Sequence, residues 1–203
     1  EIVLMSLNAL ENLVDRLAAL PGIGRKSAKR LAYYIINMPQ ADSDNLIYAI
    51  SLAKKSIQKC KICGNYSEKE VCNICSSEMR DHSKLMIVQN PKDVDSFENS
   101  NCYDGLYFVL DEEHLDPLKG IGPEEMGFGR LKTRLVQDDG ISEVILALNS
   151  NVESEQTGLL LKALVEESGK KVTKISQGIP AGGVLEYFDS ATIRQAFENR
   201  REA

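Results

Sequence analysis

The sequence lacks long apolar runs and has little histidine. No stretch approaches the roughly 18 to 20 apolar residues that cross a bilayer, and the first residues do not form a basic region followed by an apolar segment. We therefore expect a soluble, cytoplasmic protein without a membrane partner. The two histidines, His82 and His114, stand alone, so no catalytic histidine pair is indicated and surface or capping roles are the default.

Cysteine is scarce but strongly patterned. Two CxxC pairs are separated by eight residues and comprise Cys60, Cys63, Cys72 and Cys75. Such short spacers direct four thiolates at one ion, which predicts a tetrahedral zinc site with a structural role. A pair of redox dithiols and an iron–sulfur cluster are the alternatives. The fifth cysteine, Cys102, is expected to be an ordinary buried or semi-buried thiol.

Charge is distributed unevenly along the chain. The net charge is −6, yet residues 1–84 carry 12 basic and 9 acidic side chains, and residues 85–203 carry 12 basic and 21 acidic ones. This asymmetry suggests a basic functional region in the N-terminal part and an acidic remainder. Nucleic-acid binding therefore remains possible although the net charge of the whole chain is negative.

The periodicity of apolar residues divides the chain into a helical part and a mixed part. Apolar positions at helical spacing predict helices over residues 6–20, 25–37 and 45–58. Beyond the cysteines, the runs KLMIVQ, GLYFVL and EVILAL predict buried parallel strands and KVTKIS a fourth, more amphipathic one. Helices are expected over 91–99, 123–137 and 154–168. The fold class is therefore α+β multidomain, with a mostly parallel α/β sheet in its second part.

The segment LPGIGRKSAKR at residues 20–30 combines a glycine turn with a basic helix start. It lacks the spacing of a Walker A loop, and no strand precedes it, so a nucleotide site is not indicated. A helix on each side instead predicts a helix–hairpin–helix that holds the phosphodiester backbone through amides and cations. The alternative is a plain connector beside a solvated basic face. The candidate DNA-binding residues are Gly22, Ile23, Gly24, Arg25, Lys26, Lys29 and Arg30.

Several motifs in one order resemble the RecR family of bacterial recombination mediators over essentially the whole chain. They are LPGIGRKSAKRLAYYI, the paired cysteines, SKLMIVQNPKDV, HLDPLKGIGPE, VILALNSNVESEQTGLLL and GIPAGGVLEYFDSATI. The resemblance implies four domains: a helix–hairpin–helix at 1–56, a four-cysteine zinc finger at 57–80, a Toprim domain at 81–176 and a C-terminal Walker B-like segment at 177–203. It also implies a ring-shaped tetramer that binds single- and double-stranded DNA and acts with RecO and RecF to load RecA onto single-stranded DNA.

One departure from the active Toprim pattern concerns the carboxylates that hold magnesium. Such enzymes place a glutamate after the first strand and Asp-x-Asp after a later one, whereas Gln89 and the Glu153–Glu155 stretch occupy these places here. The metal cage is incomplete, so we expect no enzyme activity. The acidic cluster resembles the family's RecO-contacting region, and its tentative partner-binding residues are Gln89, Asp93, Glu153 and Glu155.

The sequence is consistent with three functions. The first is a non-catalytic DNA-binding scaffold for recombinational repair, the second a Toprim nuclease or phosphotransferase, and the third an interaction module that does not touch DNA. Nucleotide hydrolysis by the GIPAGGVLEY segment is not favoured, because no P-loop accompanies it. The aromatic pair Tyr33 and Tyr34 is predicted to lie in a core or an interface rather than to stack on bases.

Overall fold

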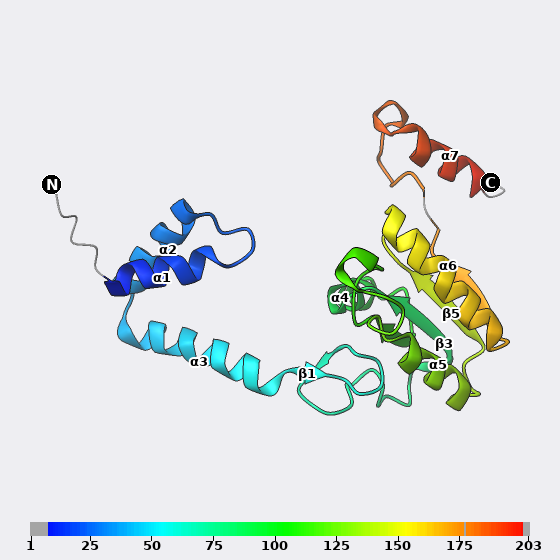
Figure 1. The fold of residues 1–203 in the computed structure, drawn as a ribbon, viewed down its shortest axis with the longest axis horizontal. Helices are drawn as coiled ribbons and strands as arrows, with labels where there is room; N and C mark the ends of the chain where they lie inside the picture. The colour runs from blue at the N-terminus through cyan, green and yellow to red at the C-terminus, as the bar shows by residue number, and fades with distance from the viewer. Residues whose placement is uncertain (1–7, 177, 201–203) are drawn as a thin grey trace. The chain divides into compact units, whose positions relative to one another are not determined.

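A computed structural model describes residues 8–176 and 178–200 (Figure 1). The chain divides into two compact units, residues 1–56 and 57–203. The α+β class with a parallel sheet in the second unit is confirmed. Among the described residues, no helix combines the length and the apolar character that a bilayer crossing requires.

The first unit consists of three helices, α1 (Asn8–Ala18), α2 (Arg25–Asn37) and α3 (Gln40–Ser56). Helices α1 and α2 pack side by side (Figure 1) around a small core of Val14, Ala28 and Ala32. The two alanines leave room for α1 to approach α2 closely.

The helix bounds agree with the sequence for α2 and differ for its neighbours. The helix predicted over 6–20 ends at Ala18, and its residues 6 and 7 lie outside the described part of the chain. The helix predicted over 45–58 begins five residues earlier, because the carbonyl of Pro39 already accepts from the N–H groups of Asp42 and Ser43. Both of these polar residues therefore lie inside the first turn of α3.

The second unit begins with a short antiparallel hairpin of β1 (Gln58–Lys59) and β2 (Tyr66–Ser67), which belongs to the cysteine-rich segment. A sheet of four parallel strands follows, in the order β4-β3-β5-β6. Each of the four strands overlaps one of the four predicted apolar runs, and β3 begins three residues before its run. Their bounds are Asp81–Val88 for β3, Gly105–Val109 for β4, Glu143–Ala147 for β5 and Lys171–Lys174 for β6.

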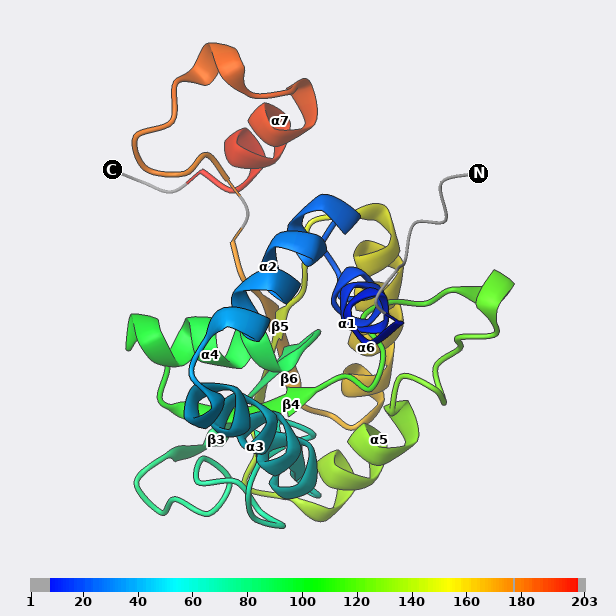
Figure 2. The ribbon, with the colours of Figure 1, turned by 90° about the vertical axis from the view of Figure 1, so that its left-hand side faces the viewer.

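Helices cover both faces of this sheet. Helices α5 (Phe128–Gln137) and α6 (Val152–Glu167) pack on the face that includes Leu85 and Ile87, and α4 (Pro91–Ser100) packs on the opposite face (Figure 2). Residues of β3, β4 and β5 alternate between these two cores, which is why these three strands contain continuous apolar runs.

Helix α5 begins five residues later than the predicted start at residue 123. Residues 122–127 form turns, in which the Met126 and Gly127 amides donate to Gly122 and Glu124. Gly127 then adopts φ +81°, a conformation that favours glycine and interrupts a helix.

Strand β4 is an edge strand whose outward carbonyls are bound by arginines. Arg80 Nη1 donates to the carbonyl of residue 105 at 3.4 Å, Arg134 Nη1 to that of residue 107 at 2.8 Å, and Arg130 Nη2 to that of residue 109 at 3.4 Å. Arg80 also forms an ion pair with Glu98 of α4. Alternate residues of a strand point the same way, so the three guanidinium groups follow one edge.

The C-terminal segment contains the short helix η2 (Leu185–Tyr187) and α7 (Ser190–Glu198). The Asp189 carboxylate caps α7 by accepting from the Ala191 and Thr192 amides. None of residues 178–200 is buried. Residues 177 and 201–203 of the predicted segment 177–203 lie outside the described part of the chain.

Candidate metal centre and nucleic-acid interface

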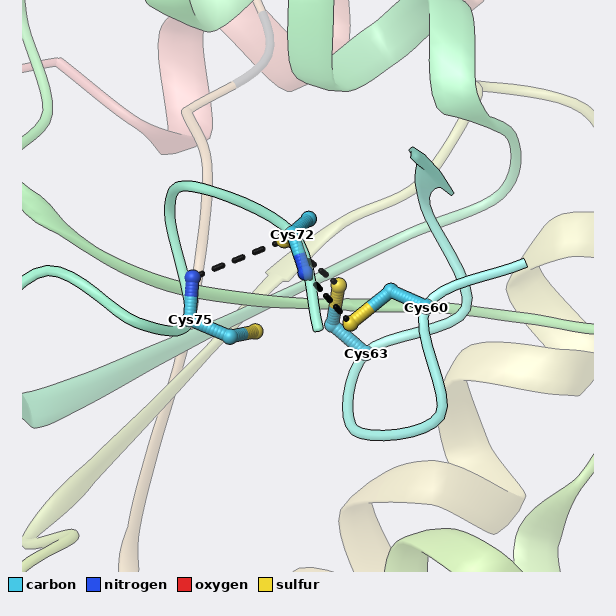
Figure 3. Close-up of side chains that lie close together, drawn as sticks. All are labelled: Cys60, Cys63, Cys72 and Cys75. Carbon is cyan, nitrogen blue, oxygen red and sulfur yellow. Dashed lines mark hydrogen bonds between the residues drawn. The ribbon is translucent and has the colours of Figure 1, made fainter. Parts of the chain in front are cut away.

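The four predicted zinc ligands converge at one point (Figure 3). Their sulfur atoms all lie within 4.8 Å of one another, and the described residues contain no other group of metal-ligating side chains of this kind. A tetrahedral zinc ion with sulfur ligands at about 2.3 Å places its sulfurs about 3.8 Å apart. The 3.6 Å separation of the Cys63 and Cys72 sulfurs fits that geometry.

The sulfur atoms of these cysteines act on one another's pKa. Hydrogen bonds with Cys63 and Cys75 lower the pKa of Cys72 well below its usual value. The hydrogen bond with Cys72 raises the pKa of Cys63, and hydrogen bonds with Cys63 and Cys72 raise that of Cys75. A cluster of this kind gains a full set of thiolates only when a cation binds, which is the chemistry of a structural metal site.

The first cysteine knuckle is docked on strand β4. The Val109 N–H donates to the Cys63 carbonyl at 2.7 Å. At Gly64, with φ +80°, an added Cβ would lie 3.1 Å from the Val109 carbonyl oxygen, so glycine permits the close approach. Ile74 packs against the cysteine cluster and against both cores of the sheet. The metal centre therefore shares its packing with the sheet.

An ion-pair bridge strengthens this docking and was missed by sequence reasoning. Lys59 Nζ lies 3.2 Å from Asp111 Oδ1, and Arg130 Nη2 lies 3.0 Å from Asp111 Oδ2. Lys59 and Asp111 are separated by 52 residues. No local pattern marks such a pair, because it forms only once the sheet places the loop after β4 beside the cysteine segment.

The glycine turn between α1 and α2 has the form expected of a hairpin. Gly22 adopts φ +79°, and the Ile23 N–H donates to the Leu20 carbonyl at 3.1 Å. Ile23 packs against the core of the first unit and anchors the turn. Gly24 caps α2 without a side-chain hydrogen bond, and an added Cβ there would meet nothing within 4 Å. The backbone at the start of α2 is open to a ligand from outside the chain.

The cations on α2 fall into two groups. Arg25 forms ion pairs with Glu11 at 3.0 Å and Asp15 at 2.8 Å, which tie α2 to α1. Lys26, Lys29 and Arg30 are exposed, and these three side chains form no ion pair with any described residue. Three of the four predicted cations are thus free to meet phosphate, while Arg25 serves the helix pair.

The predicted partner-binding residue Gln89 is buried at the end of β3, with 2% exposure. Its Nε2 donates to the Glu113 carbonyl and to Ser154 Oγ, and its Oε1 accepts from the Asn149 N–H. One amide thereby joins the loops after β4 and β5 and the first turn of α6. A carboxylate has no N–H to donate, so these partners suit glutamine.

The three acidic candidates lie at helix starts. Asp93 belongs to a capping box, and its carboxylate accepts from the Asn90 N–H at 3.0 Å. Glu153 and Glu155 are exposed in the first turn of α6, where the helix dipole favours negative charge. Ser154 between them contacts Gln89, so the structure brings Gln89 to this turn with its side chain facing inward.

The tyrosine pair on α2 does not lie in the core of the first unit. Tyr33 is 48% exposed and Tyr34 is 68% exposed. The prediction that these tyrosines lie in a core is wrong. Ala28 and Ala32 occupy the contact with α1, and the tyrosines that follow Ala32 lie on other sides of the helix.

Comparison with family models covers almost the whole chain. Residues 10–54 match the model described as "RecR, helix-hairpin-helix", and residues 57–77 match the model of the RecR zinc finger domain with four cysteines. Residues 83–176 match "Toprim domain", and residues 178–201 match "RecR, C-terminal". The zinc finger model spans all four converging cysteines, whose arrangement is able to bind a metal ion, and the two findings together support zinc as the metal.

Curated relatives align along nearly their full length. The chain is 44% identical over 191 residues to "Recombination protein RecR" of Lactobacillus acidophilus, covering 94% of this chain and 96% of that protein. Identity and coverage are the same for the protein of that name from Lactobacillus helveticus. For the one from Bifidobacterium animalis subsp. lactis, identity is 42% over 194 residues, covering 96% of both chains.

Proposed function

Because the chain belongs to the RecR family of recombination proteins, we propose that it is a non-catalytic, DNA-binding mediator that acts with RecO-like and RecF-like proteins to load RecA onto single-stranded DNA. Its role is in recombinational repair, and its site of action is the cytoplasm. Loading assays in which this chain failed to speed RecA assembly on coated single strands would contradict the proposal.

The proposed DNA binding is supported mainly by the unpaired cations beside the glycine turn between α1 and α2. Lys26, Lys29 and Arg30 have no acidic partner within the described part of the chain, and the start of α2 offers N–H groups without intrahelical acceptors. Phosphate oxygens satisfy both kinds of group without reading bases. Glycines at the turn let a phosphodiester backbone approach closely.

Replacing Lys26 and Arg30 together by alanine is expected to weaken binding to single- and double-stranded DNA. We expect a loss of roughly tenfold or more, and a slope of log affinity against log salt that is shallower by about one unit for each phosphate contact removed. Titration of labelled DNA at several salt concentrations measures both quantities.

A matched control removes two cations elsewhere. Lys92 and Lys174 are exposed and form no ion pair with a residue that the structure describes, so their double alanine variant changes the net charge equally. It should bind nearly as well as the unaltered protein. Equal losses in the two double variants, or none in the Lys26 and Arg30 variant, would contradict the assignment.

The absence of catalysis is supported by the amide of Gln89. Magnesium-dependent phosphoryl transfer needs grouped carboxylates, but Gln89 offers no charge and its side chain is already used in three hydrogen bonds. Magnesium-dependent DNA cleavage or nucleotide incorporation that disappeared on replacing Glu153 or Glu155 would favour the enzyme alternative.

The acidic first turn of α6 is the proposed surface for a basic partner of the RecO kind. Glu153 and Glu155 are exposed there, and the buried Gln89 holds the turn in place through its hydrogen bond to Ser154. Asp93 holds the neighbouring start of α4. Charge reversal at Glu153 and Glu155 that left binding to such a partner unchanged would contradict this surface.

Assembly into a ring is supported by apolar side chains that the first unit leaves uncovered. On α3, Leu46, Ile47 and Ile50 share one helical face and are 42%, 63% and 58% exposed. One chain offers few phosphate contacts and has a negative net charge. Several copies that contact the same DNA molecule would therefore raise the affinity for DNA. A molar mass in solution about four times that of one chain is expected, and a stable monomer would contradict the ring.

A further inference from the structure

One face of α2 continues beyond its cations into an aromatic side chain. Lys26, Arg30 and Tyr34 follow one another at intervals of four residues, the spacing that places side chains on the same side of a helix. Tyr34 is two residues beyond the buried Ala32, which turns it about 200° away from the contact with α1. It is 68% exposed, and its hydroxyl has no hydrogen-bond partner among the described residues.

We propose that Tyr34 is a base-stacking residue that extends the Lys26–Arg30 stripe and makes this unit bind single-stranded DNA more tightly than duplex. The inference rests on the proposed DNA binding and adds a preference of strand to it. Proteins that bind single-stranded DNA combine cations with aromatic rings. The cations contact the phosphate backbone, and the aromatic ring stacks on a base.

Strand preference follows from the accessibility of the bases. In a duplex the base faces are stacked on one another, so a ring beside the backbone finds only sugar and phosphate. In a single strand a base can turn outward and lie flat on the tyrosine ring. The neighbouring Tyr33 is rotated about 100° from this line and follows Lys29 at an interval of four residues, but it is less exposed than Tyr34, at 48% against 68%. We therefore assign stacking to Tyr34, the more accessible of the two rings.

The test compares Tyr34→Leu with the unaltered protein on three DNA molecules of equal length. These are a mixed-sequence single strand, the same strand with abasic sites in place of its bases, and a hairpin duplex. We expect about tenfold weaker binding to the single strand, with unchanged binding to the abasic strand and the duplex. The salt slope should stay the same, because no cation is removed.

Two further variants control for packing. Tyr34→Phe keeps the aromatic ring and should bind the single strand like the unaltered protein. Tyr66 on β2 is comparably exposed, at 61%, so Tyr66→Leu should leave all three affinities unchanged. The molar mass of every variant should equal that of the unaltered protein.

The sequence contains no tryptophan, which allows a direct readout of stacking. In Tyr34→Trp the single indole should lose fluorescence on binding the intact single strand and keep it on binding the abasic one. Equal weakening of all three DNAs by Tyr34→Leu, an altered molar mass, or no change at all would overturn the proposal. If the unaltered protein binds none of the DNAs, the proposed function itself fails.

Discussion

Replacing Cys72 by serine is expected to release the zinc ion and to unfold the cysteine-rich segment. Cys72 is one of the four converging ligands and its sulfur lies 3.6 Å from that of Cys63, so serine in its place removes a thiolate from the metal site. Structural zinc contributes about 10–16 kcal/mol to the folding of zinc-finger peptides, which is comparable to the whole stability of a domain, about 5–15 kcal/mol.

The loss should reach beyond the segment itself. Ile74 packs on both cores of the sheet, and Cys63 accepts from Val109, so the sheet loses packing when the knuckles open. We expect less than one zinc per chain by metal analysis and a clearly lower Tm. Cys102 is exposed, so the burial expected from the sequence is wrong, and it lies outside the cluster. Cys102→Ser is therefore the control and should keep both zinc and Tm. A Cys72→Ser protein with a full zinc content and an unchanged Tm would show that zinc is held differently.

Replacing Gln89 by leucine is expected to destabilise the sheet domain by about 3 kcal/mol. The Glu113 carbonyl, the Asn149 N–H and the buried Ser154 hydroxyl would each lose a partner, and an unsatisfied buried polar group costs about 1–3 kcal/mol. We expect Tm to fall by roughly 10 °C. The control is Gln156→Leu, an exposed glutamine on α6 whose replacement should change little.

A glutamate at this position gives a pH-dependent version of the same test. In Gln89→Glu the introduced carboxyl would be buried and would face the Glu113 carbonyl, and both effects raise its pKa in the folded state. For an acid with a raised folded pKa, stability is present at low pH and is lost as pH rises through that pKa. The deficit relative to the unaltered protein should therefore grow above about pH 4.3, the ordinary pKa of glutamate. A deficit independent of pH, or none, would contradict the hydrogen-bond arrangement.

The sequence predicted best the features that depend on neighbouring residues. The four zinc ligands follow from two short spacers, and helix α2 follows from its own periodicity between a glycine turn and a proline. Two helix starts were predicted wrongly, because α3 begins early, directly after Pro39, and the turns before Gly127 delay the start of α5.

Features that depend on distant parts of the chain could not be predicted. Arg25 belongs to the basic stretch, but its partners Glu11 and Asp15 come from the preceding helix, which only the packing of α1 on α2 brings near. The sequence marks Gln89 as a departure from an acidic pattern. It does not indicate the hydrogen-bond partners of Gln89, which lie more than 20 residues away along the chain.

The arginine-lined edge of β4 has a consequence for solubility. An uncovered edge strand offers N–H and C=O groups to any other strand and invites aggregation. On β4 the carbonyls of residues 105, 107 and 109 are already occupied by Arg80, Arg134 and Arg130, and the zinc knuckle holds the Val109 N–H. Strand addition is blocked on this side for as long as the metal holds the knuckle in place. Zinc thus protects the edge of β4 from strand-to-strand aggregation as well as the protein from unfolding, and metal-stripped samples should scatter more light as they warm.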